Sequence, residues 1–229
     1  MPTLAGRNAA FRREEGGFLL RALIFANGKL NNGRAVRAAL TEAGDDALII
    51  AADGGMRHAL ALGRRVDVVV GDLDSLGSAP AGVQVIQTPA EKDETDLELA
   101  LCLAAERGAT WIRVIGAAGG RLDQTLGNVM LLAMPALRGV DVRLVSGEQE
   151  AWMVGAHTVI AGQEGDTLSL LPLGGDVEGV RTEGLYYPLK GETLHFGPAR
   201  GMSNVLTGRR AEVWVERGLL FAVYTPGRA

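Results

Sequence analysis

Two carboxylates that follow a buried-strand pattern are the residues best suited to chemistry. Residues 66–75 read V-D-V-V-V-G-D-L-D-S, a β-branched run typical of a buried parallel strand followed by Asp72 and Asp74. Residues two apart in an extended segment point to the same side, so both carboxylates should project together past the strand. Open α/β sheets bind ligands at that edge, and paired carboxylates suit Mg²⁺ on a phosphate-bearing substrate. The alternative is an acidic surface turn.

Two further polar segments follow apolar runs. Asp53-Gly54-Gly55 comes directly after I-I-A-A, where glycines let the backbone approach a ligand and the next helix offers N–H groups to an anion. Asp53 has a second interpretation as a helix cap. Asn27-Gly28 follows the first apolar run, and an ordinary turn explains it as well as a ligand-binding loop does.

Two more polar segments open predicted helices. Lys92 can neutralise a phosphate, and Asp96 either binds a metal or satisfies the helix dipole. Residues 116–124, G-A-A-G-G-R-L-D-Q, form a glycine-rich strand-to-helix loop, which is a candidate phosphate cradle. Arg121 adds a guanidinium suited to phosphate oxygens. Together these strand-end segments predict a Mg²⁺-dependent enzyme acting on a nucleotide or another phosphorylated compound.

Alternating strands and helices are expected to position these side chains. Strand patterns occupy residues 19–26, 47–52, 66–70, 83–87, 111–115 and 140–145, and helical spacing occupies 34–43, 56–62, 95–107 and 122–134. The helix over 95–107 has Thr95 as its cap, Asp96 and Glu98 in its first turn, and Gly108 at its end. The alternation predicts an α/β fold with a doubly wound, mostly parallel sheet.

From about residue 150 the helical spacing disappears. The runs T-L-S-L-L, V-R-T, L-Y-Y-P-L, A-E-V-W-V and L-L-F-A-V-Y are separated by glycines, which predicts strands of an all-β sandwich or small barrel. We therefore expect a loosely ordered extension over residues 1–17, an α/β nucleotide-binding domain over 18–147 and a β-sandwich domain over 148–229.

The composition and charge of the chain argue against some classes of binding partner. The chain has 229 residues, a formal net charge of -4 and no long Lys/Arg run, so we expect no nucleic-acid partner. The apolar run near the N-terminus is interrupted by Arg21 and is too short to span a bilayer, and no signal-peptide cleavage site follows it. We expect no membrane partner and a cytoplasmic location. The three histidines lack metal-ligand spacing, and no role is assigned to them.

In their order, the polar segments resemble those of the thiamine pyrophosphokinase (thiamine diphosphokinase) family. The matching motifs are A-D-G-G at 52–55, G-D-L-D-S at 71–75, K-D-E-T-D-L-E-L-A-L at 92–101, G-G-R-L-D-Q at 119–124, G-D-T-L-S-L-L-P-L at 165–173, G-V-R-T-E-G-L-Y-Y-P-L at 179–189 and G-M-S-N at 201–204. The resemblance covers nearly the whole chain from about residue 22. It implies an α/β catalytic domain followed by a β-sandwich, a homodimer with sites between subunits, and pyrophosphoryl transfer from ATP to the hydroxyl of thiamine with release of AMP.

The same resemblance implies roles for individual residues. Asp72 and Asp74 should hold Mg²⁺ on the ATP phosphates, with Asp53 and Asp96 as further acidic ligands or neighbours. The implied nucleotide contacts are Asn27, Gly28, Asp53, Gly54, Gly55, Ser75, Lys92, Asp93, Thr95, Gly119, Gly120, Arg121 and Gln124. Ser203 and Asn204 should hydrogen-bond the aminopyrimidine of thiamine, because their side chains offer donors and acceptors. Phe221 is the candidate aromatic contact to thiamine, with a strand core position as the alternative.

The resemblance leaves the catalytic base open. The candidate catalytic residues are Asp72, Asp74, Asp96 and Asp123. Many relatives have His where Gln124 stands, and Gln cannot act as a base, so a base role falls to Asp123 or a metal-site aspartate. Little base help is needed where phosphoryl transfer relies on positioning and charge stabilisation.

Three other functions would account for part of this set of motifs. A pyrophosphokinase for another heterocyclic alcohol, such as a hydroxymethylpterin, shares the acidic first half, but G-M-S-N and L-Y-Y-P-L favour thiamine. A nucleotide-sugar transferase with a D-x-D motif explains Asp72 and Asp74 but not the segments 92–101 and 119–124. A non-enzymatic nucleotide or thiamine sensor does not need four acidic clusters at one sheet edge.

Overall fold

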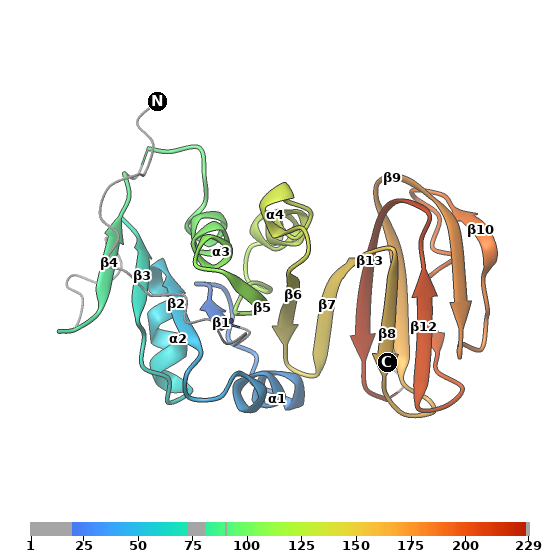
Figure 1. Cartoon of the computed structure of the whole chain (residues 1–229), viewed down its shortest axis with the longest axis horizontal. Helices are drawn as coiled ribbons and strands as arrows, with labels where there is room; N and C mark the ends of the chain where they lie inside the picture. The colour runs from blue at the N-terminus through green and yellow to red at the C-terminus, as the bar shows by residue number, and fades with distance from the viewer. Residues whose placement is uncertain (1–19, 73–80, 90, 228–229) are drawn as a thin grey trace.

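A parallel sheet forms the first half of the chain in the computed structural model, which describes residues 20–72, 81–89 and 91–227. Its strands lie in the order β4-β3-β2-β1-β5-β6, and all neighbours are parallel (Figure 1). Their bounds are β1 (Leu20–Phe25), β2 (Leu48–Ala52), β3 (Val68–Gly71), β4 (Gln84–Gln87), β5 (Ala109–Ile115) and β6 (Asp141–Ser146). The predicted parallel α/β sheet is confirmed.

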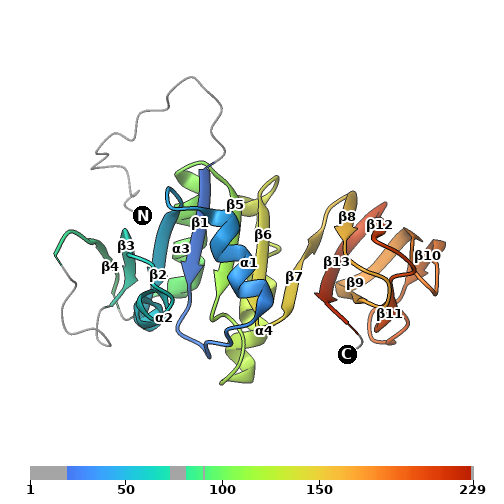
Figure 2. The same ribbon diagram turned by 90° about the horizontal axis from the view of Figure 1, so that it is seen from below.

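Helices cover both faces of this sheet. They are α1 (Arg34–Ala43), the short 3-10 helix η1 (Asp53–Gly55), α2 (Met56–Ala61), α3 (Asp96–Glu106), α4 (Leu122–Leu131) and the 3-10 helix η2 (Pro135–Leu137). α1 and α2 lie on one face of the sheet, and α3 and α4 lie on the other (Figure 2). Buried side chains of α1 and α2 pack on the first face, and those of α3 and of the segment after α4 pack on the second. The sheet is therefore doubly wound, as predicted.

Local sequence explains how two of these helices begin and end. Thr95 Oγ1 accepts a hydrogen bond from the Glu98 N–H at 3.1 Å, which confirms the predicted cap of α3, and Gly108 follows the helix with a φ of 85°. α4 ends at Leu131, three residues before the predicted end. Met134 precedes Pro135 and is extended, because proline disfavours helical backbone at the residue before it.

The direction in which successive strands are added to the sheet reverses between β1 and β5, although the two strands are parallel. These two strands are neighbours, yet the helices that follow them, α1 and α4, lie on opposite sides of the sheet (Figure 1). The Ala26 N–H donates to the Ile115 carbonyl at 2.8 Å, and the Gly28 N–H donates to the Gly116 carbonyl at 2.8 Å. The pairing therefore continues just beyond the strands and leaves the loops to separate there, which is the usual ligand-binding position of open α/β sheets.

The second half is a two-layered β structure. Its strands are β7 (Gln149–Val154), β8 (His157–Ala161), β9 (Thr167–Glu183), β10 (Lys190–Leu194), β11 (Asn204–Val205), β12 (Arg210–Trp214) and β13 (Arg217–Thr225). The first part of β9 pairs with β13, and the later part pairs with β10 and β12. Gly174 and Gly175, with φ of 73° and 155°, lie at the change of partner. The layers enclose a shared apolar core, and the predicted β-rich second domain is confirmed.

Two strand assignments need correction. T-L-S-L-L and V-R-T belong to one continuous strand, β9, because its glycines bend the strand without ending it. L-Y-Y-P-L is a loop with an isolated β-bridge between Leu185 and Leu206, and the Tyr186 N–H donates to the Val205 carbonyl at 2.8 Å. Pro188 cannot donate to a sheet ladder, which is consistent with this loop. None of the helices in the described ranges has the length and apolar character needed to span a bilayer.

The two halves are joined by hydrogen-bonded strands. β6 and β7 form an antiparallel hairpin, and β7 also pairs with β13. Because the pairing runs across residues 147 and 148, the predicted division of the chain at that point stays a prediction. The predicted extension over residues 1–17 lies outside the described residues.

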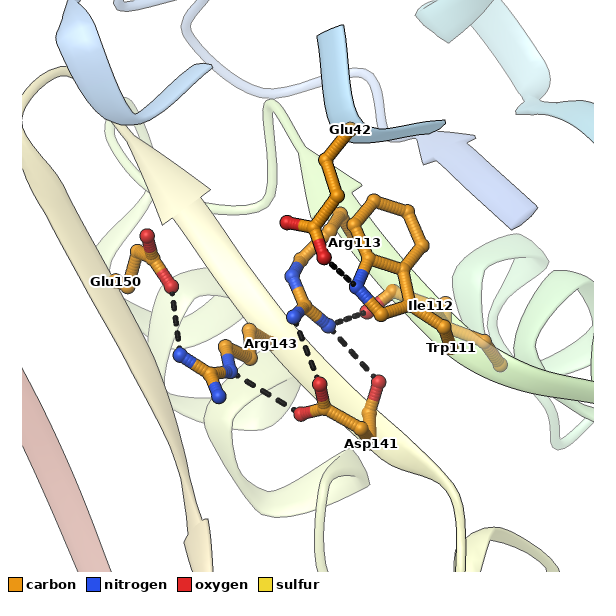
Figure 3. A network of polar contacts seen from close by, with 7 residues as sticks. All are labelled: Glu42, Trp111, Ile112, Arg113, Asp141, Arg143 and Glu150. Atoms are coloured by element: carbon orange, nitrogen blue, oxygen red, sulfur yellow. Dashed lines mark hydrogen bonds and ion pairs between the residues drawn. The ribbon is translucent and has the colours of Figure 1, made fainter. Parts of the chain in front are cut away.

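A polar network reinforces this junction (Figure 3). Arg113 on β5 is 4% exposed and donates from Nη2 to Asp141 Oδ2 at 2.7 Å. Arg143 on β6 donates from Nε to Asp141 Oδ1 at 3.1 Å and from Nη1 to Glu150 Oε2 of β7 at 2.9 Å. The charges of β5, β6 and β7 are thereby paired in one chain of contacts, which satisfies the buried guanidinium.

Candidate active site

A cavity lies at the carboxyl edge of the parallel sheet, where β1 and β5 separate. We call it the sheet-edge cavity; its volume is about 540 Å³. Segments that follow β1, β2, β3 and β5, together with the start of α3, line it. The lining residues are Ala26, Asn27, Gly28, Ala52, Asp53, Asp72, Lys92, Glu94, Thr95, Asp96, Leu97, Ala117, Gly119, Asp123, Gln124, Thr125, Gly127, Asn128 and Leu131. Most of the predicted nucleotide-binding residues are therefore near one another.

Three predicted carboxylates meet in the sheet-edge cavity. Asp53 follows β2, Asp72 follows β3, and Asp96 opens α3. Asp53 has a φ of 47°, a left-handed backbone that Asp tolerates better than most residues. The Asn27 side chain donates from Nδ2 to Asp53 Oδ2 at 2.9 Å. Asp74 and Ser75, also predicted for this site, lie outside the described residues.

Lys92 faces the acidic side of the cavity. Its side chain is 14% exposed, and Nζ forms an ion pair with the Asp96 carboxylate. Nζ also donates to Thr88 Oγ1 at 2.5 Å. The ammonium group is therefore held at the cavity wall beside one of the carboxylates, where it lowers the local negative charge.

The glycine-rich loop is tied to the first turns of α4. The Gly119 N–H donates to Thr125 Oγ1 at 3.2 Å, and Thr125 Oγ1 donates to the Arg121 carbonyl at 3.0 Å. Asn128 Nδ2 donates to the Ala117 carbonyl at 2.7 Å. The helix thus fixes the loop, with its own N-terminus beside the cavity, an arrangement suited to an anionic group.

Arg121 and Asp123 form an exposed ion pair at the start of α4. Arg121 donates from Nε to Asp123 Oδ1 at 3.1 Å and from Nη2 to Asp123 Oδ2 at 2.5 Å. This hydrogen-bonded guanidinium lowers the pKa of Asp123 to about 2. A carboxylate of such low pKa is a weak proton acceptor.

Five predicted nucleotide contacts do not line the cavity: Gly54, Gly55, Asp93, Gly120 and Arg121. Two of them have a packing role. A Cβ on Gly55 would lie 1.9 Å from the Phe25 carbonyl oxygen, and a Cβ on Gly54 would lie 2.5 Å from Asn27 Oδ1. These glycines let the turn after β2 approach the end of β1. The nucleotide contacts of all five residues stay predictions.

The donor set suits a magnesium ion bound together with phosphate. Among the described residues, no group of three or more His, Cys, Asp or Glu is arranged as a complete metal site. Mg²⁺ does not require one, since it usually binds one or two carboxylates and takes its remaining ligands from water and phosphate. Asp53, Asp72 and Asp96 supply hard oxygen donors along one cavity, so the residues present fit such an ion.

A second, smaller cavity of about 320 Å³ lies in the β-rich half. We call it the β-domain cavity; its lining residues are Leu170, Tyr186, Tyr187, Pro188, Leu189, Arg200, Gly201 and Asn204. Asn204 is 6% exposed. Its Oδ1 accepts hydrogen bonds from the Tyr187 N–H at 3.0 Å and the Val205 N–H at 2.9 Å, and its Nδ2 donates to the Tyr187 carbonyl at 2.8 Å. In this structure the amide therefore helps to secure the loop over residues 185–189, which we call the tyrosine loop.

The other two predicted thiamine contacts do not line this cavity. Ser203 is exposed and has a φ of 53°, and its N–H donates to Ser169 Oγ at 3.0 Å. Phe221 is 8% exposed on β13 and belongs to the core that also contains side chains of α3. The strand core position of Phe221 is thus observed, and the thiamine contacts of both residues stay predictions.

Several residues that line the two cavities were not among the predicted site residues. Glu94, Thr125 and Asn128 border the sheet-edge cavity, and Tyr186, Tyr187 and Arg200 border the β-domain cavity. Thr125 and Asn128 could have been found from their spacing, since both follow the glycine-rich loop on one side of a helix. Two adjacent tyrosines before Pro188 were an available signal for an aromatic loop.

Comparisons with known proteins agree with this architecture. The family model described as "Thiamin pyrophosphokinase, catalytic domain" matches residues 41–144, and the model described as "Thiamin pyrophosphokinase, vitamin B1 binding domain" matches residues 156–220. The chain is 30% identical over 164 residues to a thiamine pyrophosphokinase of Bacillus subtilis (strain 168), covering 67% of this chain and 75% of that protein.

Solved structures give the same result. The crystal structure of thiamine pyrophosphokinase from Bacillus subtilis superposes with a TM-score of 0.79 at 27% identity, covering 90% of this chain and 99% of that chain. Thiamin pyrophosphokinase from Candida albicans has a TM-score of 0.71 at 16% identity and covers 90% of both chains, which supports the fold alone. From both family models and the 30% identity across two thirds of its length, this chain belongs to the thiamine pyrophosphokinase family.

Proposed function

We propose that this chain transfers the pyrophosphoryl group of ATP to the hydroxyl of thiamine, giving thiamine diphosphate and AMP. The observation that carries the proposal is the meeting of Asp53, Asp72 and Asp96, from three separate segments, in one cavity of a chain that belongs to this family. An acidic wall, a lysine and a glycine-rich loop at a helix N-terminus are the groups that a magnesium nucleotide requires.

The acidic residues hold the metal on the phosphates in this proposal. The proposed metal ligands are Asp53, Asp72 and Asp96, which line the cavity, together with Asp74 of the G-D-L-D-S motif. Bound Mg²⁺ would offset charge on the phosphate oxygens during transfer. Lys92 lies beside Asp96 and contacts a phosphate oxygen once ATP is bound.

The reaction requires positioning more than proton transfer. The thiamine hydroxyl oxygen attacks the β-phosphorus, the bond from that phosphorus to the bridging oxygen of the α-phosphate breaks, and AMP leaves with the electron pair. Gln124 lines the cavity and can orient the hydroxyl, but it cannot accept the proton. Asp123 is a weak base while Arg121 is bound to it, so the proton passes to a metal-site aspartate or to water.

The β-domain cavity is the proposed thiamine site. Tyr186 and Tyr187 are each 66% exposed and lie in its wall. Thiamine carries a positively charged thiazolium ring, and aromatic faces attract cations. Ser203, Asn204 and Phe221 remain the proposed contacts to the aminopyrimidine and thiazolium groups.

We place the complete site between two copies of the chain. Among the described residues the two cavities share no lining residue, which is consistent with a site that takes one cavity from each subunit. Leu122, Leu126 and Met130 form an exposed apolar stripe along α4, beside the sheet-edge cavity, and are 72%, 51% and 65% exposed. Exposed apolar patches of this kind favour a protein partner, and a homodimer covers the stripe.

Mixing two inactive variants tests the shared site. One variant carries Asp72→Asn, and the other carries Tyr186→Ala with Tyr187→Ala. If each site takes one cavity from each subunit, random reassociation restores about a quarter of wild-type turnover, since half of the dimers are mixed and each has one intact site. Turnover that stays at the level of the separate variants would place both cavities of a site in one subunit.

Product analysis tests the proposed function itself. Purified protein is incubated with thiamine and Mg-ATP, and the nucleotides are separated. Equal amounts of AMP and thiamine diphosphate support the proposal, whereas ADP with thiamine monophosphate contradicts the attacked phosphorus. Binding of Mg-ATP without thiamine-dependent turnover favours a hydroxymethylpterin-type substrate or a sensor. The absence of nucleic-acid and membrane partners and the cytoplasmic location stay predictions.

A further inference from the structure

Two adjacent residues of α2 hold the segment that follows β1. Arg57 Nη2 donates to Asn27 Oδ1 at 3.1 Å, and His58 Nε2 donates to the Gly28 carbonyl at 2.8 Å. The Gly28 N–H in turn donates to the Gly116 carbonyl at 2.8 Å. Asn27 and Gly28 line the sheet-edge cavity, whereas the exposed Arg57 and the half-buried His58 do not.

Arg57 and Asp53 together determine the orientation of the Asn27 amide. A guanidinium has donors and no acceptor, so it must meet the oxygen of the amide. The amide nitrogen then points the other way and donates to Asp53 Oδ2 at 2.9 Å. If the amide were reversed, its oxygen would face a carboxylate and its nitrogen would face a cation, and both contacts would be repulsive.

Close packing leaves this arrangement little freedom. A Cβ on Gly54 would lie 2.5 Å from Asn27 Oδ1 and 2.7 Å from Arg57 Nη2, so a side chain at residue 54 would displace the amide or the guanidinium. A Cβ on Gly71 would lie 3.3 Å from the Asp53 Cα atom. The Asp53 backbone is in the left-handed region at φ 47°. Such strain persists where the surroundings determine the conformation.

We infer that Arg57 is a positioning residue for Asp53 and acts through Asn27. The guanidinium fixes the amide, and the amide fixes the carboxylate that faces the cavity. His58 holds the neighbouring backbone, which keeps Asn27 in reach of both partners. This inference rests on the proposed function only in that Asp53 is taken to bind the magnesium of Mg-ATP.

A double-mutant cycle on nucleotide affinity tests the inference. Isothermal titration calorimetry without thiamine measures the Kd of ATP, with Mg²⁺ and in EDTA, for wild type, Arg57→Met, Asn27→Ala and the double variant. Loss of a hydrogen bond within a charged chain should raise the Kd for Mg-ATP about tenfold in each single variant. The double variant should be no weaker than Asn27→Ala, and in Arg57→Met the Kd in EDTA should stay within about twofold of wild type.

Further variants separate positioning from simple loss of charge. Arg57→Lys should recover most of the affinity, because an ammonium also donates to the amide oxygen. Arg37→Met removes an exposed arginine of α1 that lines neither cavity and should change nothing. In steady-state assays Arg57→Met should raise the KM for Mg-ATP and leave the KM for thiamine unchanged.

Three results would overturn the inference: an unchanged Kd in Arg57→Met, additive losses in the double variant, or an equal loss of affinity in EDTA. The second and third would mean that Arg57 contacts the phosphates directly. Failure of the proposed function is distinct, since it would appear as wild-type protein that makes no thiamine diphosphate while these affinities behave as expected.

Discussion

The sheet-edge cavity and the β-domain cavity obtain their polar groups by different means. In the first, Asp53 and Asp72 are the residues that directly follow β2 and β3, so the parallel sheet itself delivers them to one edge. In the second, a loop containing Tyr186 and Tyr187 is held both by backbone hydrogen bonds and by the Asn204 side chain. A change at the first should therefore affect chemistry, whereas a change at the second should affect structure and binding together.

The largest expected effect is in the sheet-edge cavity. Asp72→Asn keeps the size of the side chain but removes the charge that holds the metal, and kcat should fall by about 10²–10³-fold. The thermal unfolding midpoint should change little, because Asn has nearly the same size and shape as Asp. Asp45→Asn, at a fully exposed carboxylate, is the matched control. Unchanged turnover in Asp72→Asn would contradict the proposal that Asp72 binds the metal.

An intermediate effect is expected in the β-domain cavity. Asn204→Leu leaves the N–H groups of Tyr187 and Val205 without their buried acceptor, which should lower the free energy of unfolding by about 1–3 kcal/mol. The KM for thiamine should rise while the KM for Mg-ATP stays constant. Urea unfolding and steady-state kinetics measure the two quantities.

Ser203→Ala is the comparison variant for Asn204→Leu. Its side chain is exposed, so Ser203→Ala should raise the KM for thiamine without changing the free energy of unfolding. If Asn204→Leu unfolds at the wild-type urea concentration, the amide does not secure the tyrosine loop, and the contrast between the two cavities disappears.

The smallest expected effect concerns the Arg121–Asp123 pair. Because the pKa of Asp123 in the folded chain is about 2, below its ordinary value of 3.8, the pair stabilises the fold above that ordinary value and loses its effect as the pH falls through about 2. Both side chains are exposed, so the change in stability should be slight. A carboxyl NMR titration should give a midpoint of about 2, and in Arg121→Gln the midpoint should move toward 3.8.

Binding of Mg-ATP gives a second test of the Arg121–Asp123 pair in the same NMR titration. If Arg121 turns to a phosphate oxygen when Mg-ATP binds, the Asp123 midpoint should rise in the complex. An identical midpoint in wild type and in Arg121→Gln would show that the ion pair does not persist in solution.

Local signals predicted much of the fold and the sheet-edge cavity. α1 begins and ends at the predicted residues, and Thr95 caps α3 as expected, because these features depend on neighbours within one or two turns. The tyrosine loop was assigned to a strand because its apolar letters match strand composition. Its true conformation depends on Asn204, 17 residues after Tyr187, which no local pattern reveals.

The sequence by itself determined the parallel order of elements and therefore the edge at which Asp53, Asp72 and Gly28 meet, since strand period and chain direction bring the carboxyl ends of parallel strands to one side. Only the tertiary structure decided which polar groups pair there. The Arg57–Asn27–Asp53 chain joins α2 to the segments after β1 and β2, and the Asn204 amide pairs with backbone groups of a distant loop. Such hydrogen bonds depend on distances and angles across the fold, which spacing along the chain does not specify.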